Sequence, residues 1–289
     1  MNARELVDSV SELVSLPAAH HRLHELLDDP RATREEIAEV VSLDPALTAR
    51  LLRAVNSPPY ANSGDVSRVA DAAFIIDDAD LKGLSMATTA VDFFGRIDGD
   101  MVDIYDFWNH SVCCGLVAKT LAGKCGFEST EDIFQAGLLH DIGHLPIYHA
   151  MPDKARQVLV EAGKEESYRY RAEREILGFT HAEVGAEILS HWGLPDLHRE
   201  MVRYHHEPEA AVDYPIETAL VHIATGVANR IEPSWKMSFL HQVSLGQIRP
   251  YAWRMTGLTP DLIASTLEEI NMQSFAVLSV IDPDSMSIY

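Results

Sequence analysis

The sequence predicts an all-α protein, a two-lobed helical bundle, and three observations lead to this prediction. Signals for helix N-termini recur along the chain of 289 residues, whereas alternating β-branched runs bounded by tight turns are missing. Apolar residues make up 47% of the chain, which is enough for one large helical core or two coupled lobes. A polar, glycine-containing stretch near residue 98 separates two helical parts.

In the N-terminal part, N-cap residues show where helices begin, and prolines show where one of them ends. Thr33 and Glu36 form a T-x-x-E capping box, and Asp44 is an N-cap that is followed by proline at the first helical position. The helix that starts there has an apolar face, and the prolines within residues 56–59 end it because proline cannot continue the hydrogen-bond ladder. We therefore expect a buried helix with a sharp end.

In the C-terminal part, two helices carry the first histidines of interest. One long helix, DFWNHSVCCGLVAKTLA, has His110 on an apolar stripe, so His110 is expected to face inward. The next helix opens near residues 129–132 and carries His140 and Asp141 at its C-terminal end. We expect Gly143 to end that helix in the left-handed conformation, which glycine adopts freely.

Two further helices follow. Thr180 and Glu183 form a second capping box, and another helix begins at Pro195 and ends before Pro208. His205 shares a line on this last helix with the apolar residues four and eight positions before it, so it is the more inward of two adjacent histidines.

Charge and cysteine content restrict the function and the compartment. Lys and Arg total 23 against 44 for Asp and Glu, and the net charge of −21 repels phosphate backbones, so broad nucleic-acid binding is not expected. A metal ion could still reverse the sign of the charge inside one cleft, and a phosphate ester could then bind there. The three cysteines form no CxxC pair, and no segment has the length and apolarity of a membrane span or a secretory leader. These features predict a cytoplasmic protein.

Histidines are concentrated in one part of the chain. Nine of the 14 lie between His110 and His206. Imidazole and carboxylate together suit a divalent transition metal such as Fe, Mn or Zn, and the adjacent His140 and Asp141 can approach one ion from the end of a helix. If Asp141 bridged a second ion, the pair of metals could activate water and hold the oxygens of a phosphoryl group.

Four motifs resemble the successive signatures of HDOD domains, which are similar to HD and HD-GYP hydrolases. They are FWNHS, AGLLHDIGHL, HAEVGAEIL and WGLPDLHREMVRYHHEP. The segments SLPAAHHRLHELLDDP, VVSLDPALTARLLRAVNSPPY and VSRVADAAFII resemble the helical lobe that is specific to HDOD domains. The resemblance covers roughly residues 10 to 230 and implies an N-terminal helical lobe at 1–98, an HD-like helical lobe at 99–232 and a C-terminal helical extension at 233–289.

The resemblance also implies a set of metal ligands. The positions that match the family motifs are His110, His140, Asp141, His181, His205 and His206. If the protein is an enzyme, Asp141 and His140 are the catalytic candidates, and no other catalytic residue is assigned. The structural alternatives stay open: His110 as a hydrogen-bonded core histidine, the His140–Asp141 pair as a helix-end arrangement, and His181 as an exposed first-turn residue.

Two positions depart from the HD and HD-GYP patterns. Thr225 stands where the HD pattern ends in a carboxylate ligand, so the metal affinity is expected to fall. His144 stands where HD-GYP enzymes carry a lysine, and a neutral imidazole lacks the fixed positive charge of that lysine. The GYP segment is also missing, which argues against hydrolysis of cyclic dinucleotides.

The resemblance and these departures lead to three functional hypotheses. The first is a non-catalytic or weakly catalytic output module of bacterial signal transduction that works through protein contacts with a receiver or kinase system. The second is a metal-dependent phosphohydrolase that acts on a small nucleotide, and the third is a pseudoenzyme that senses a nucleotide without cleaving it.

Outside the motifs, a few residues receive structural interpretations. His20, His21 and His24 have no partners at metal spacing and are expected at the surface or at a lobe interface. Cys113 and Cys114 are expected to fill the core.

Overall fold

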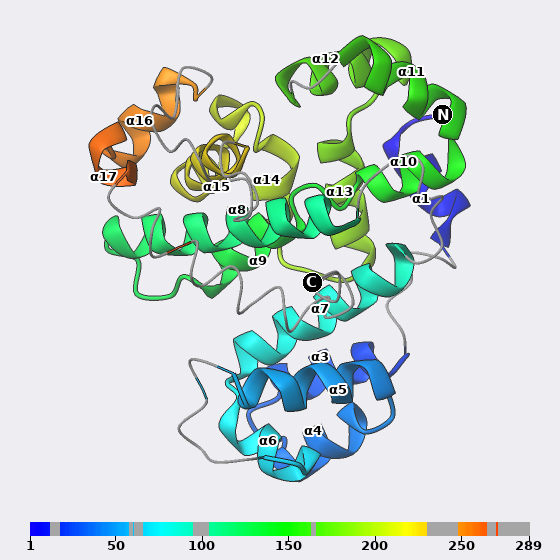
Figure 1. The fold of residues 1–289 in the computed structure, drawn as a ribbon, viewed down its shortest axis with the longest axis vertical. Coiled ribbons are helices and arrows are strands. Elements are labelled where there is room, and N and C mark those ends of the chain that lie inside the picture. Colours follow the sequence, from blue (N-terminus) through cyan, green and yellow to red (C-terminus); the bar gives the residue numbers. More distant parts are fainter. Residues whose placement is uncertain are drawn as a thin grey trace. The chain divides into compact units, whose positions relative to one another are not determined.

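The structure is a computed structural model that describes residues 1–11, 18–57, 60, 66–94, 104–162, 166–229, 248–264 and 270. Every regular element within these residues is a helix, which confirms the all-α prediction (Figure 1). The chain divides into two compact units: unit 1 comprises Met1–Val14 and Arg96–Ser274, and unit 2 comprises Ser15–Gly95 and Phe275–Tyr289.

The N-terminal helix belongs to unit 1. This helix, α1 (Ala3–Ser9), buries Leu6 and Val7 and packs against helices that follow much later in the chain, α10 (His144–Ala150) and α13 (His181–His191). The predicted N-terminal lobe at 1–98 included this helix, whereas the structure groups it with the C-terminal part of the chain. The three-part division stays a prediction, since most of 233–289 lies outside the described residues.

Unit 2 is a small helical lobe with its own apolar core. The predicted caps are confirmed, because Thr33 accepts from the backbone of Glu36 and Asp44 accepts from the backbone N–H groups that follow it. The core is formed by fully buried residues such as Leu23, Leu47 and Leu51. The described helices of unit 2 are α3 (Ala18–Asp28), α4 (Arg34–Val41), α5 (Pro45–Val55), α6 (Val69–Ile75) and α7 (Asp78–Phe94).

The structure corrects the interpretation of two N-terminal histidines. His20 is fully buried, with Nε2 2.8 Å from a carboxylate oxygen of Asp44 and Nδ1 2.8 Å from the hydroxyl of Thr89. His24 is also buried, whereas His21 is exposed. A surface position is therefore wrong for His20 and His24, and the partners of His20, at the N-cap of α5 and on α7, cannot be recognised from local spacing.

Unit 1 holds the predicted motif helices. Trp108, Leu121, Ile133 and Leu139 are fully buried, and so are Cys113 and Cys114, as expected. None of the helices in the described part of the chain is long and apolar enough to cross a membrane. Besides α1, α10 and α13, unit 1 contains α8 (Ile104–Lys124), α9 (Glu131–Leu139), α11 (Pro152–Ala162), α12 (Glu166–Ile176), α14 (Asp196–Tyr204), the 3₁₀ helix η2 (Pro208–Ala210), α15 (Pro215–Ala228), α16 (Pro250–Thr256) and α17 (Pro260–Ala264).

Two glycines let α8 and α9 approach closely. A Cβ atom on Gly137 would lie 2.8 Å from the Cα atom of Gly115, so a side chain at this crossing would push the helices apart. His110 lies on α8 five residues before Gly115, and His140 follows Gly137 by three residues. The crossing therefore brings the first two histidines of the motifs together.

Gly143 has a different role from the predicted one. Its φ of −67° and ψ of −14° are right-handed, and it precedes α10 as the N-cap. A Cβ atom there would lie 2.0 Å from the carbonyl oxygen of His181 and 2.5 Å from the backbone nitrogen of Gly185. The glycine is needed for close packing of this turn against α13 and not for a left-handed helix end.

Candidate metal centre

His140 and His205 are presented by the same local arrangement at the ends of two helices. His140 is the C-cap of α9, and its Nδ1 lies 2.7 Å from the carbonyl oxygen of Gly137. His205 is the C-cap of α14, and its Nδ1 lies 2.7 Å from the carbonyl oxygen of Val202. A carbonyl only accepts, so each Nδ1 donates, and a ring that is neutral keeps its lone pair on Nε2.

His181 is oriented by a carboxylate from α12. It is the first residue of α13, behind the predicted capping box of Thr180 and Glu183, which is confirmed. Glu173 accepts from the backbone N–H of His181 at 2.8 Å and lies 2.7 Å from its Nδ1. His181 is fully buried, so its interpretation as an exposed first-turn residue is wrong.

The side chain of Asp141 lies at the point where these rings converge. Its Oδ1 is 3.2 Å from Nε2 of His181, 3.5 Å from Nε2 of His140 and 3.9 Å from Nε2 of His205. Its Oδ2 is 3.8 Å from Nε2 of His110. Asp141 is 5% exposed, so almost no solvent reaches the carboxylate that faces these nitrogens.

The spacing of these atoms fits a divalent ion. Ligand atoms bound at about 2.1 Å to one ion lie about 3.0 Å apart at a right angle and about 3.4 Å apart at the tetrahedral angle. Nε2 of His205 is buried and has no hydrogen-bond partner within the part of the chain that the structure describes, although it can accept. A buried acceptor in this state is costly in a protein interior, and a cation would satisfy it.

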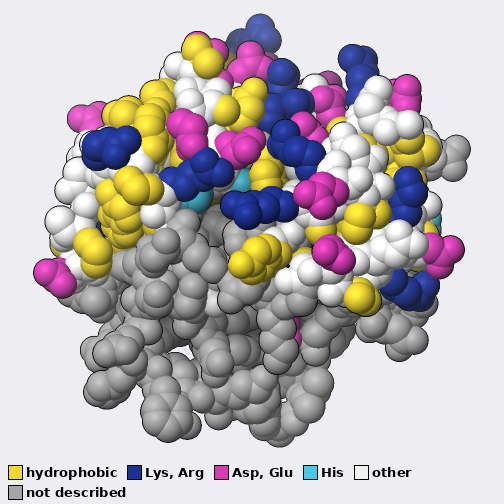
Figure 2. Space-filling model, turned by 90° about the horizontal axis from the view of Figure 1, so that it is seen from above, with side chains coloured by type: hydrophobic (Ala, Val, Ile, Leu, Met, Phe, Trp, Pro, Cys, Tyr) yellow, Lys and Arg dark blue, Asp and Glu magenta, His cyan; other side chains and the backbone are white. Residues whose placement is uncertain are grey.

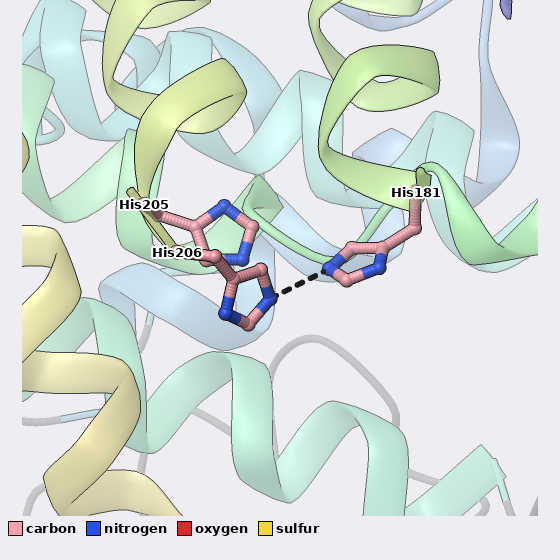
Figure 3. Close-up of side chains that lie close together, drawn as sticks. All are labelled: His181, His205 and His206. Atoms are coloured by element: carbon pink, nitrogen blue, oxygen red, sulfur yellow. Dashed lines mark hydrogen bonds between the residues drawn. The ribbon is translucent and has the colours of Figure 1, made fainter. Parts of the chain in front are cut away.

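All six predicted ligand positions come together, in two of the three described groups that could hold an ion, and Asp141, His144 and His181 form the third. His110, His140 and Asp141 form one group, and His181, His205 and His206 form the other; within each, one ligand atom per residue lies within 4.8 Å of the others. Figure 3 shows the second group, with the rings of His205 and His206 side by side and His206 joined to His181 at 3.1 Å between their Nε2 atoms. Buried His and Asp clusters of this geometry could bind metal.

The charges of the centre are set by the mutual effects of neighbouring carboxylates and histidines. Burial by itself would lower the pKa of His181, but the carboxylates of Glu173 and Asp141 outweigh burial and raise it to about 10. Burial would raise the pKa of Asp141, yet the neighbouring His140 and His181 hold it well below its ordinary value. Without metal, the centre thus holds an imidazolium between two carboxylates.

His144 is buried and packs against other residues of the centre. Its ring stacks on that of His181 with centroids 3.9 Å apart, and its Nδ1 lies 3.2 Å from Oε1 of Glu173. Its side chain is 1% exposed, and burial lowers its pKa to about 4, with the charge of His181 acting in the same direction. His144 is therefore neutral at pH 7, as expected from the sequence, and it is shielded from solvent.

Thr225 offers no charge at its position on α15. Its hydroxyl donates to the carbonyl of Val221 at 3.0 Å and lies 3.5 Å from Sγ of Cys114. The side chain is buried against α8, and both of these partners are uncharged. The carboxylate that the HD pattern would supply here has no substitute in these contacts.

Glu173 and Tyr170 also belong to the surroundings of the centre, although neither lies in a family motif. Tyr170 lies with its ring centroid 4.5 Å from that of His206, and its hydroxyl donates to Glu207 at 2.9 Å. Both residues lie on α12, a helix with a high proportion of charged residues and no recognised motif. Their spacing of three residues, which places them on one helical face, is the single local signal for this role.

Comparisons with known proteins agree with the motifs. The sequence model of the HDOD domain matches residues 13–208. A candidate phosphohydrolase of Shewanella amazonensis SB2B has a similar structure, with a TM-score of 0.73, 26% identity, and coverage of 96% of this chain and 97% of that one. An HDOD domain protein of Geobacter sulfurreducens matches with a TM-score of 0.72, 26% identity and 96% coverage of both chains.

A relative was also found among curated sequences. An uncharacterized protein of Treponema pallidum (strain Nichols) is 24% identical over 214 residues, which are 73% of this chain. The aligned region is 41% of that relative, so this chain spans less than half of its length.

Proposed function

Because this chain belongs to the HDOD domain family, we propose that it is a signalling output module whose histidine centre binds divalent metal but hydrolyses phosphate esters slowly or not at all. The observation that carries the proposal is the state of His144. At the position where the related hydrolases have a lysine, this chain has a neutral ring that is buried between His181 and Glu173. Such a ring supplies no positive charge to a reacting phosphoryl group.

The replacement at Thr225 supports the same proposal. A carboxylate ligand would add negative charge to the centre, whereas the Thr225 hydroxyl is hydrogen bonded to the backbone of its own helix. With fewer anionic donors, a bound Fe, Mn or Zn ion is held less tightly. The metal then serves to order the ends of α9 and α14 and the start of α13, and the module transmits its state through protein contacts with a receiver or kinase system.

The test combines metal analysis with turnover. Full-length chain is purified without chelators and loaded with Mn²⁺ or Fe²⁺, its metal content is measured, and hydrolysis of bis(p-nitrophenyl) phosphate and of small nucleotides is followed. We expect bound metal in the wild type, loss of that metal in His140→Ala, and equal background hydrolysis in both. Turnover that His140→Ala abolishes would contradict the proposal, and a wild type without metal would refute its metal-binding part.

A second candidate function is metal-dependent phosphohydrolysis, and one observation favours it. The two ligand groups meet at Asp141, which lies 3.2 Å from His181 of the second group while it belongs to the first. If two ions were bound, they would supply Lewis acidity toward a phosphoryl group. This candidate predicts turnover in the wild type, and it predicts that Thr225→Asp increases both metal affinity and rate, with Thr225→Asn as the uncharged control.

A further inference from the structure

His222 lies between the histidine centre and the start of α16. This residue of α15 is 8% exposed, and its Nδ1 lies 2.7 Å from the carbonyl oxygen of His205. Its Nε2 accepts a hydrogen bond of 3.0 Å from the backbone N–H of Arg249, which is the N-cap of α16. His222 therefore joins a candidate metal ligand to the residue from which α16 begins.

Both hydrogen bonds require the same form of the His222 ring. A carbonyl oxygen only accepts, so Nδ1 must carry the hydrogen, and Nε2 must lack one in order to accept from Arg249. The neutral ring with its hydrogen on Nδ1 satisfies both partners. Because both nitrogens are engaged, His222 is a positioning residue and not a further metal ligand.

Two other contacts hold the same segment of chain. One turn further along α15, a Cβ atom on Gly226 would lie 2.7 Å from Cγ1 of Ile248, which is buried, so the glycine leaves room for this side chain. The guanidinium of Arg249 pairs with Glu209 on η2, four residues after His205. The entry to α16 is thus held both to α15 and to the segment that follows His205.

The contact with His205 links the interior of the centre to the backbone. Nε2 of His205 faces Asp141, whereas its carbonyl oxygen accepts from His222. His205 is also the C-cap of α14, so a metal ion on Nε2 would restrict the ring and, with it, the backbone at this helix end. The oxygen to which His222 donates would then be restricted as well.

Helix α16 can carry such a change toward the surface of the protein. His140, His181 and His205 are fully buried, and on the face in Figure 2 the visible histidine side chains are recessed between charged ones. Metal at these buried ligands reaches a partner protein only through the elements around them. Helix α16 packs against α15 (Figure 1), and its Arg254 is exposed.

We propose that His222 couples the occupancy of the metal centre to α16, so that metal binding orders the start of this helix. The inference rests on the proposed metal binding and adds a path by which occupancy changes the structure outside the centre. Such a coupling is reciprocal, so a change at the start of α16 must alter the metal affinity by the same factor.

The first experiment measures hydrogen exchange of the full-length chain with and without Mn²⁺, by mass spectrometry of peptides that cover residues 249–257. In the wild type we expect Mn²⁺ to slow exchange in α16 by about fivefold or more. His222→Leu removes both hydrogen bonds and should make this exchange independent of Mn²⁺. His222→Gln, whose amide can donate and accept, should restore part of the effect. Peptides from α4, in unit 2, are the internal control and should not respond to Mn²⁺.

The second experiment tests the reverse direction with a matched pair of variants at Arg249. Arg249→Pro removes the backbone N–H that His222 accepts, and the φ of −62° at this position is one that proline adopts. We expect the calorimetric Mn²⁺ affinity to fall by about fivefold or more. Arg249→Ala keeps the N–H and loses only the exposed pair with Glu209, so its affinity should stay within about twofold of the wild type.

The outcomes separate this inference from the proposed metal binding. A wild type that binds Mn²⁺ but shows equal exchange in α16 with and without it would overturn the coupling and leave metal binding intact. Equal Mn²⁺ affinities in the wild type, His222→Leu and Arg249→Pro, with unchanged circular dichroism, would also overturn it. A wild type that binds no Mn²⁺ refutes both proposals. If Arg249→Pro does not fold, the two His222 variants decide the question.

Discussion

At the scale of single residues, Glu173 controls the orientation of His181. It receives the backbone N–H and faces Nδ1 of His181 with one oxygen, and it contacts His144 with the other. Burial would raise the pKa of Glu173, but His181 and His144 hold it below its ordinary value, so the carboxylate is ionised at pH 7. An ionised carboxylate behind a ligating imidazole fixes the ring and increases its basicity.

Replacement of Glu173 is therefore expected to weaken metal binding. Glu173→Gln keeps the size of the side chain but removes its charge, and we expect the Mn²⁺ affinity to fall by about 10- to 100-fold. Glu175→Gln, at an exposed position of the same helix, is the control. A calorimetric titration that gives the same affinity for all three proteins would show that Glu173 does not act on the metal through His181.

Metal binding is also expected to release a proton from His181. The pKa of His181 is about 10 in the metal-free protein, so the ring is protonated at pH 7 and must lose its proton before Nε2 can bind metal. The apparent affinity should rise about tenfold per pH unit as the pH increases toward this pKa. Calorimetry in two buffers with different ionisation enthalpies measures the released proton, and identical heats in both would contradict the expectation.

The six ligand positions were predicted from the family motifs. The carboxylate that orients His181 lies outside the motifs and could not be predicted from them. Glu173 is one of several acidic residues in α12, and the local sequence is typical of a solvated helix. Its role depends on the packing of α12 over the start of α13, which no motif encodes. Ligation of metal by the six residues stays a prediction.

At the scale of elements, α3 and α7 pack through polar side chains. His20 contacts Thr89, and Asp28 pairs with Lys82, so the residue numbers run in opposite directions along the two helices. This register places His24 opposite Ser85. Nε2 of His24 and Oγ of Ser85 are both buried without a hydrogen-bond partner in the described part of the chain, which makes this pair a weak point of unit 2.

Removal of both polar groups is expected to stabilise unit 2. The double variant His24→Leu with Ser85→Ala replaces two unsatisfied polar groups by apolar ones, and we expect the free energy of unfolding to rise by about 1 kcal/mol. Urea denaturation followed by circular dichroism measures the change, with the exposed His21→Leu as the control. A double variant that is less stable than the wild type would indicate that the two groups are bridged by buried water.

The crossing of α8 and α9 gives a second element-scale prediction. Gly137→Ala would place Cβ 2.8 Å from the backbone of α8, so the helices must separate at Gly115. We expect a loss of about 2 kcal/mol in the free energy of unfolding and a lower metal affinity, because His140 moves away from His110. Gly123→Ala on α8, whose Cβ would meet no atom within 4 Å, is the control for a helical glycine in open surroundings.

Local signals predicted helix starts better than they predicted close contacts. The caps at Thr33, Asp44 and Thr180 depend on side chains within three residues, and all three were confirmed. The role of Gly143 depends instead on the approach of α13, 38 residues further along the chain at His181, and therefore could not be derived from local sequence.

At the scale of the whole molecule, several buried histidines make stability depend on pH. Burial is the largest cause that lowers the pKa of His24, His144 and His222 from 6.5 to about 4. Between these values the unfolded chain binds protons that the folded chain excludes, so the free energy of unfolding falls as the pH decreases from 6.5 to 4. His181 acts with the opposite sign, and its contribution is present below pH 6.5 and lost as the pH rises through about 10.

We therefore expect the metal-free chain to lose stability on acidification from pH 6.5. Thermal unfolding at intervals between pH 4.5 and 9 measures the dependence, and His222→Gln should reduce its slope by removing one of the three neutral rings. A stability that stays constant between pH 6.5 and 4.5 would contradict the neutral state of these histidines.

The backbone contacts of His140 and His205 have a consequence for how such a domain can change over evolutionary time. Both rings are aimed by main-chain carbonyls three residues earlier, at Gly137 and Val202, so their direction survives the replacement of surrounding side chains. Substitutions at 144 and 225 are therefore expected to leave these two rings in place, so the charge of the centre could change while its histidine framework stays intact.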